Sequence, residues 1–110
     1  ATNVVGQAGF GTSTSGTTAT MLNTPQSVAA SATGVLAVSD TQNSRVLLWY
    51  ETPTTDGSSA HAVIGQTNFT SSTASSNGAN VMDTQDGVTW SGSDLLVSGS
   101  GMKRTMIFSP

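Results

Sequence analysis

The sequence has no cysteine, a single histidine and only three cationic side chains in 110 residues. The absence of cysteine excludes a disulfide, a thiolate metal site and a cysteine nucleophile. The cations are Arg45, Lys103 and Arg104, whereas a surface that binds phosphate needs several clustered Lys or Arg side chains. Because the formal net charge is also -3, we do not expect nucleic acid as a partner.

Long hydrophobic runs are missing as well. The longest uninterrupted apolar run covers only Val46 to Tyr50, whereas a transmembrane helix needs roughly 20 apolar residues. We therefore expect no membrane insertion.

Charged residues make up only 8% of the chain, against about 25% in ordinary soluble domains. Ser and Thr together fill about a third of it, a composition that suits β-strands joined by small-residue loops. Low charge with abundant Thr, Ser, Gly and Ala is typical of secreted bacterial surface proteins. The composition therefore favours an extracellular or cell-surface location.

The residue types needed for catalysis are scarce and scattered. His61 is the only histidine, and a metal site needs several convergent ligands. The closest carboxylates, Asp83 and Asp86, fit a turn better than a cation site. No Gly-x-Ser-x-Gly elbow is present, and Gly9-x-Gly11 lacks the third glycine and the following helix of a dinucleotide loop. We therefore predict no catalytic, cofactor-binding or metal-binding residue, no cofactor and no enzymatic activity.

An internal repeat runs through nearly the whole chain. Four pairs of segments match at an offset of 59 or 60 residues: 4–10 with 63–69, 22–28 with 82–88, 35–39 with 94–98, and 45–49 with 104–108. The one-residue slips fall between matched segments, where loops tolerate them. We therefore divide a single domain, residues 1–110, into a first unit of about 1–50, a connector of residues 51–59 and a second unit of about 60–110.

Both units carry short apolar, β-branched segments separated by Gly, Asn and Asp, which is typical of strands and turns. The expected strands are 27–31, 35–39, 45–51 and 61–66, with an outer strand at 4–7 and a further strand at 103–108. No segment shows a convincing helical period. The pattern predicts an all-β fold.

The stretch from Leu22 to Val28, followed by Gly34 to Leu47, resembles the NHL repeat. That family carries a Pro-x-Gly-Val strand, a strand ending in Asp-Thr, and Asn-x-Arg-Val leading into the next strand. The resemblance implies two tandem four-stranded antiparallel propeller-type blades, with one blade split between the chain termini. Blades of this family usually close as a ring of six. Some family members use a metal held by several histidines or bind RNA on a basic face, and this sequence can supply neither.

The second unit keeps the spacing of the first but loses this signature. Pro25 faces Gln85, Asp40 faces Gly99 and Asn43 faces Met102, whereas Arg104 keeps the place of Arg45. We therefore expect a looser turn between Ser98 and Lys103.

The signature residues Asp40, Asn43, Arg45 and Arg104 are interpreted as structural. Asp and Asn side chains can hydrogen-bond the backbone of their own tight turn, and the arginines can reach an acidic or carbonyl partner within or between blades.

Aromatic residues fall in the expected strands or at their ends. Trp49, Tyr50 and Trp90 fit either packing between blades or a surface for a ligand or partner.

The expected function is a non-catalytic structural or interaction module that assembles by β-strand complementation into a larger oligomer or extracellular assembly. The outer strand at 4–7 of one chain would complete the blade that holds 103–108 of the next, closing a ring or extending a filament. Alternatively, the chain is an excerpt of something larger, or a subunit packed against a larger protein assembly, and these strands are covered there. The alternative function is a lectin-like propeller module that binds carbohydrate in pockets between blades.

Overall fold

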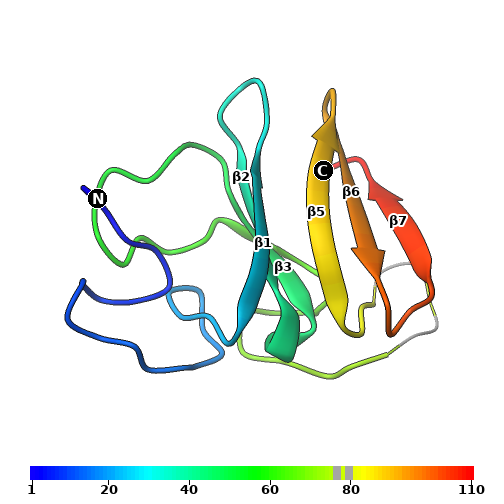
Figure 1. The fold of residues 1–110 in the computed structure, drawn as a ribbon, viewed down its shortest axis with the longest axis horizontal. Helices are drawn as coiled ribbons and strands as arrows, with labels where there is room; N and C mark the ends of the chain where they lie inside the picture. The colour runs from blue at the N-terminus through cyan, green and yellow to red at the C-terminus, as the bar shows by residue number, and fades with distance from the viewer. Residues whose placement is uncertain (76–77, 79–80) are drawn as a thin grey trace.

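A computed structural model of the chain describes residues 1–75, 78 and 81–110. This part of the chain is all-β and forms a four-stranded and a three-stranded antiparallel sheet (Figure 1). Sheet one has the strand order β1 (Pro25–Ala30), β2 (Leu36–Asp40), β3 (Arg45–Trp49) and β4 (Ala62–Ile64). Sheet two has the order β5 (Gln85–Ser91), β6 (Asp94–Gly99) and β7 (Arg104–Phe108). A short 3-10 turn, η1 (Thr41–Asn43), joins β2 to β3.

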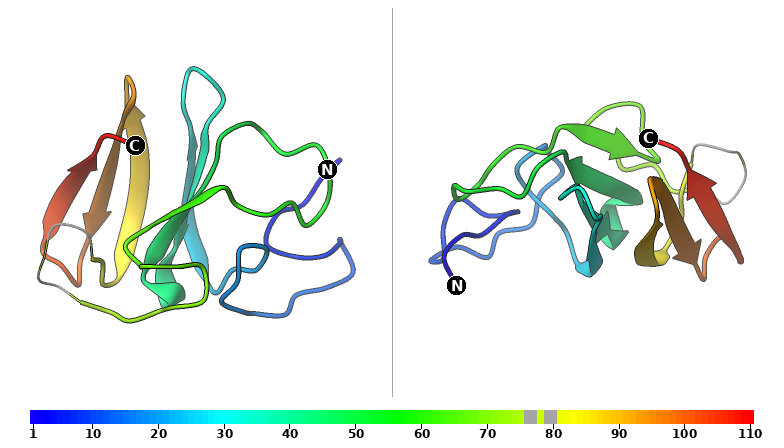
Figure 2. Two further views of the ribbon diagram at one scale, coloured as in Figure 1. Left: turned by 180° about the vertical axis from the view of Figure 1, so that it is seen from behind. Right: turned by 90° about the horizontal axis from the view of Figure 1, so that it is seen from above.

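The two sheets stack face to face with their first strands, β1 and β5, side by side (Figures 1 and 2). Because side chains alternate between the two faces of a strand, every second residue of each strand points into the contact. The buried apolar residues between the sheets are Ala37, Val46, Leu48, Met82, Val88, Leu95, Val97 and Met102.

The opposite face of sheet one carries a second buried cluster. Val38, Leu47 and Trp49 pack there with Leu22 from the N-terminal segment and Ala60 from the loop that leads into β4. Sheet one is therefore covered on both faces over β2 and β3, whereas Val28 of β1 is 63% exposed on the second face. No helix in the described residues is long and apolar enough to cross a membrane.

Hydrogen bonds between the sheets gather at the start of β5. The Gln85 carbonyl accepts the hydroxyls of Ser39 at 3.1 Å and Thr41 at 2.8 Å, and the Gln85 side chain donates to the Arg45 carbonyl. Farther along the strand, the Val88 N–H donates to the Ser27 hydroxyl at 3.2 Å. These bonds fix the two sheets relative to each other.

The sequence repeat is also a structural repeat. Both sheets pair their first two strands with a register shift at the same place, between Pro25 and Ser27 in one and between Gln85 and Gly87 in the other. Counterpart residues also share unusual positive φ angles, such as 88° at Gly6 and 97° at Gly65. Sheet one nevertheless takes its fourth strand, β4, from residues 62–64, beyond the connector that was expected to separate the two units.

A glutamine side chain closes a loop in each unit. Gln7 donates to the Thr14 carbonyl at 2.7 Å and accepts the Thr14 N–H at 3.0 Å. Gln66 makes the same pair of bonds to Thr73 at 2.9 and 3.1 Å. Each glutamine amide thus pairs with both backbone groups of its threonine, as a neighbouring strand would. The sequence did not predict this role.

The strands expected at 27–31, 35–39, 45–51, 61–66 and 103–108 are confirmed as β1, β2, β3, β4 and β7 with shifted ends. The strand expected at 4–7 is wrong, because residues 5–9 form bends and pair with no strand in the described chain. Sheet two therefore has three strands where sheet one has four.

The turn expected to be looser in the second unit has no 3-10 turn, and its Ser100 and Lys103 are exposed where Thr41 and Ser44 are buried. Gly99 pairs with Arg104 as Asp40 pairs with Arg45, so the two turns have equal length. Lys103 N–H donates to the Gly99 carbonyl at 2.9 Å. The buried Met102 side chain lies directly over Gly99, where a Cβ atom would be 2.4 Å from its methyl carbon. An apolar side chain therefore fills this turn in place of a polar network.

Candidate functional site

The three signature residues of the first unit form one buried polar cluster. Asp40 accepts the Arg45 Nε–H at 2.7 Å, the Asn43 side-chain amide at 2.9 Å and the Asn23 backbone N–H at 2.7 Å. The Asp40 and Arg45 side chains are both 0% exposed. A buried carboxylate is costly unless charge and hydrogen bonds compensate it, and here both do. The cluster has no free group to offer a ligand.

The rest of the Arg45 guanidinium joins distant loops. Its terminal nitrogens donate to the carbonyls of Thr18 at 2.8 Å, Met21 at 3.0 Å and Phe69. Arg45 thereby ties the N-terminal loop and the loop after β4 to the start of β3. This arrangement fits the structural role expected from the sequence.

Arg104 repeats only part of this pattern. It donates to the Gly78 carbonyl at 2.6 Å, the counterpart of the Thr18 bond in the first unit. Its buried Nε atom has no hydrogen-bond partner among the described residues, because Gly99 stands where Asp40 stands in the first unit. Arg104 therefore lacks the ion pair of Arg45.

The three aromatic candidates divide between core and surface. Trp49 is 1% exposed and donates its indole N–H to the Ser58 carbonyl at 3.0 Å. It packs in the second buried cluster, with Leu22, Val38 and Leu47. Tyr50 is 57% exposed, and its ring stacks on His61 with centroids 5.0 Å apart.

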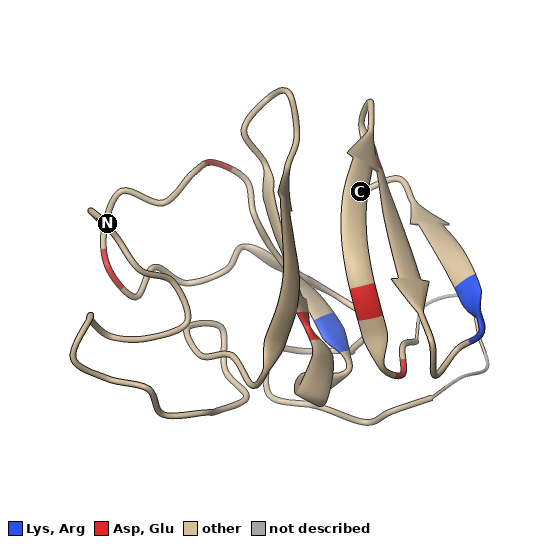
Figure 3. Ribbon diagram, in the orientation of Figure 1, with Lys and Arg blue, Asp and Glu red and all other residues tan. Residues whose placement is uncertain are grey.

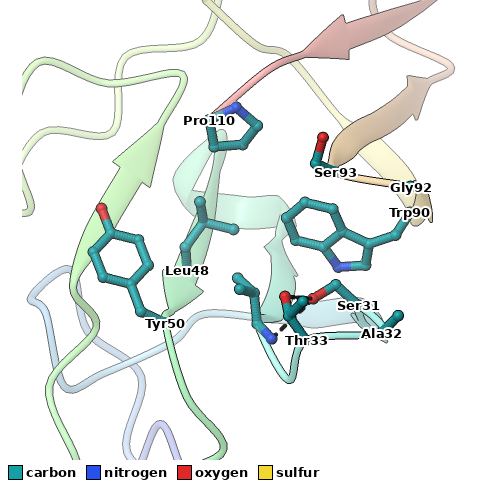
Figure 4. Close-up of a pocket in the computed structure, with 10 residues that line it drawn as sticks. Ser31, Ala32, Thr33, Leu48, Tyr50, Trp90, Gly92, Ser93 and Pro110 are labelled. Atoms are coloured by element: carbon teal, nitrogen blue, oxygen red, sulfur yellow. Dashed lines mark hydrogen bonds between the residues drawn. The ribbon is translucent and has the colours of Figure 1, made fainter.

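Tyr50 and Trp90 border the same pocket, which we call the tip pocket (Figure 4). It has a volume of about 410 Å³ and lies between the β1–β2 and β5–β6 hairpin tips. In Figure 4 the two aromatic rings stand on opposite sides, with Leu48 between them and Pro110 above. The hydroxyls of its lining come from Ser31, Thr33, Ser93 and Tyr50, and none of its lining side chains is charged. The pocket is suited to a neutral ligand.

A second hollow, which we call the edge groove, lies between β4 and β7. It measures about 630 Å³ and is lined by Ala62 to Gln66 on one side and by Ile107 to Pro110 on the other. The equivalent space beside β3 in sheet one is occupied by β4 itself. The edge groove therefore borders the position that a fourth strand of sheet two would take.

The backbone groups that face this position follow from strand geometry. The His61 N–H donates to the Leu48 carbonyl at 2.8 Å, so the polar groups of Leu48 face β4. Because these groups alternate between the two edges of a strand, those of Val46 also face β4. At an offset of 59, Thr105 and Ile107 are their counterparts on β7, and no described strand pairs with that edge.

Charge is sparse over the whole structure (Figure 3). Basic residues lie only at the starts of β3 and β7, and the described residues contain no group of three or more His, Cys, Asp or Glu side chains able to hold a metal ion. Recognition at either hollow would depend on backbone pairing, apolar contact and hydroxyl groups.

No protein-family model matches the sequence, and no curated protein is significantly similar to it. The resemblance of the first unit to the NHL repeat therefore depends on the residues quoted above.

Proposed function

We propose that this chain is a non-catalytic assembly module that self-associates by β-strand complementation. Residues 3–5, which we call the donor segment, would add to β7 of a second copy as the fourth strand of its sheet two. The observation that carries the proposal is the outer edge of β7 beside the edge groove, with which no described strand pairs. The donor segment is the repeat counterpart of β4, which fills the same place in sheet one.

The repeat specifies how the added strand would pair. In sheet one, Ile64, Val63 and Ala62 lie opposite Val46, Leu47 and Leu48. Adding 59 to the residue numbers of β3 and subtracting 59 from those of β4 gives antiparallel pairs between the two copies: Val5 with Thr105, Val4 with Met106, and Asn3 with Ile107. The backbone groups of Asn3 and Val5 make no hydrogen bond within the described chain, which leaves them free to pair.

The exposed first strand of sheet one, β1, supports stacking of a second copy against it. Val28 is 63% exposed, whereas its counterpart Val88 is 8% exposed because sheet one covers it. On the far face of sheet two, Ser98 and Ser100 hold the places of Ser39 and Thr41, whose hydroxyls bind the next strand.

Such a contact joins different surfaces of the two copies, so it would close a ring or extend a filament. We propose accordingly that the sheets are propeller-type blades of the NHL kind, in an extracellular or cell-surface assembly.

Mass measurement across a concentration series tests the proposal. Native mass spectrometry and light scattering of the wild-type chain, from about 1 μM to 1 mM, should show species larger than the monomer, because separate protein patches associate with Kd values in this range when they bury modest areas. Ile107→Lys should abolish them without unfolding the monomer, since Ile107 is 68% exposed and a lysine on an edge strand blocks pairing.

The matched control is Ser72→Lys, which adds the same charge to an exposed loop residue. It should associate like the wild type. A wild-type chain that stays monomeric throughout, or an Ile107→Lys variant that associates as well as the control, would refute the proposal.

The tip pocket supports a second candidate function, the binding of a neutral carbohydrate. Tyr50 and Trp90 would supply aromatic walls, and Ser31 and Thr33 would supply hydroxyls at the rim. NMR titration with a panel of neutral oligosaccharides should shift the Trp90 indole signal but not that of buried Trp49. Absence of any saturable shift at Trp90 would remove this candidate.

A further inference from the structure

Residues of the connector bind the donor segment through its backbone. The Val4 N–H donates to Asp56 Oδ1 at 3.0 Å, and the Gly57 N–H donates to the Val4 carbonyl at 3.0 Å. Both polar groups of Val4 are therefore used within the chain. Gly57 has a φ of 66°, and a Cβ atom there would lie 3.2 Å from the Gln7 carbonyl oxygen. This close approach favours glycine at position 57.

The connector holds one particular edge of the donor segment. In β4, the polar groups of Ala62 and Ile64 face β3, so those of Val63 face away from it. Val4 is the counterpart of Val63. In the pairing proposed above, the groups of Val4 would likewise point away from the neighbour's β7. The bonds to Asp56 and Gly57 would therefore survive assembly and leave the pairing edge clear.

We infer that the connector pre-positions the donor segment for strand addition. Asp56 and Gly57 hydrogen-bond the edge of the segment that does not pair with the neighbour. This inference rests on the proposed self-association. Adding a disordered strand requires its backbone to be ordered at the moment of binding, which weakens association. A segment already held along one edge has lost part of that freedom beforehand. Asp56 is thus a positioning residue and makes no contact with the neighbour.

Replacing Asp56 shows whether association depends on its hydrogen bond to Val4 or only on its negative charge. Asp56→Ala removes the acceptor for the Val4 N–H and should weaken self-association about tenfold, measured by sedimentation equilibrium. Asp56→Asn keeps a side-chain oxygen that can accept this bond and should restore most of the affinity. Glu51→Ala removes the same charge from an exposed connector residue and should associate like the wild type.

Two further measurements separate positioning from folding. Asp56 is exposed, so the Asp56→Ala monomer should melt within about 2 °C of the wild type. Hydrogen exchange at the Val4 amide, measured in dilute monomer, should accelerate in Asp56→Ala but not in Glu51→Ala.

The outcomes distinguish the positioning role of the connector from the proposed self-association itself. A wild-type chain that never associates overturns both. If the wild-type chain associates and Asp56→Ala associates with equal affinity, only the positioning role of the connector is overturned. Tighter association of Asp56→Ala also overturns it, because the connector would then be restraining the segment rather than presenting it.

Discussion

Replacing Asp40 by alanine is the sharpest test of how the first unit is held together. The substitution removes a carboxylate that accepts hydrogen bonds from Arg45, Asn43 and Asn23 at 2.7 to 2.9 Å. The Asp40 and Arg45 side chains are 0% exposed, so water cannot take the place of the lost oxygen atoms without opening the structure. The variant leaves a buried guanidinium without its counter-charge.

The expected loss of stability is large for a chain of this size. Removing one partner of a buried ion pair costs about 3–5 kcal/mol. With an unfolding entropy of roughly 2.1 cal/mol/K per residue, a 110-residue chain should lose roughly 13–22 °C in melting temperature. A loss of this size is comparable with much of the total stability of a small domain.

Thermal and urea unfolding of Asp40→Ala, followed by circular dichroism, measure this loss. Glu51→Ala is the matched control, because it removes an exposed carboxylate and should change stability by less than about 0.5 kcal/mol. If Asp40→Ala loses less than about 1 kcal/mol, the carbonyls around Arg45 are sufficient to hold it, and the reasoning from the buried ion pair is wrong.

Three further predictions follow from the repeat. Mixing Val4→Cys and Met106→Cys chains under mild oxidation should give a disulfide-linked dimer on a non-reducing gel. The reason is that Val4 and Met106 would be opposite each other as a non-hydrogen-bonded pair, with Cα atoms about 4.5 Å apart. A dimer yield no higher than random collision produces would contradict the proposed register. Gly65→Ala should destabilise the chain by at least 1 kcal/mol in urea unfolding, since its φ is 97° and a Cβ atom would lie 2.9 Å from Met82. Gln66→Ala should cost about 1–2 kcal/mol by the same assay, through loss of its paired bonds to Thr73, and a neutral result would remove the loop-closing role.

Much of the fold could be predicted because its signals are local. The uninterrupted apolar run that forms β3 lies between turn residues, and all five residues of the strand are buried. The roles of Asp40, Asn43 and Arg45 were also predictable in kind, since short polar side chains after a strand commonly close a turn. The three backbone carbonyls that bind Arg45 lie 24 to 27 residues away, in loops that carry no pattern of their own.

The errors and omissions arose where a residue's structure depends on a partner far along the chain. Residues 4–7 have strand-like composition, yet a strand needs a neighbour to pair with, and within the described chain they have none. The contact of Asp56 with Val4 joins residues 52 apart in sequence, in a connector whose turn composition gives no sign of it. The paired glutamines could have been found, because Gln7 and Gln66 recur at the repeat offset.

The hydrogen bonds between Gln85 of sheet two and sheet one bear on the order of folding and assembly. Its counterpart in the first unit is Pro25, which has no side-chain amide, and the counterpart of the Ser27 hydroxyl is Gly87. A contact between two copies would therefore have fewer hydrogen bonds than the contact between the two sheets of one chain. Each chain should complete its own interior first and associate afterwards, so that the assembled fraction rises with concentration while every monomer stays folded.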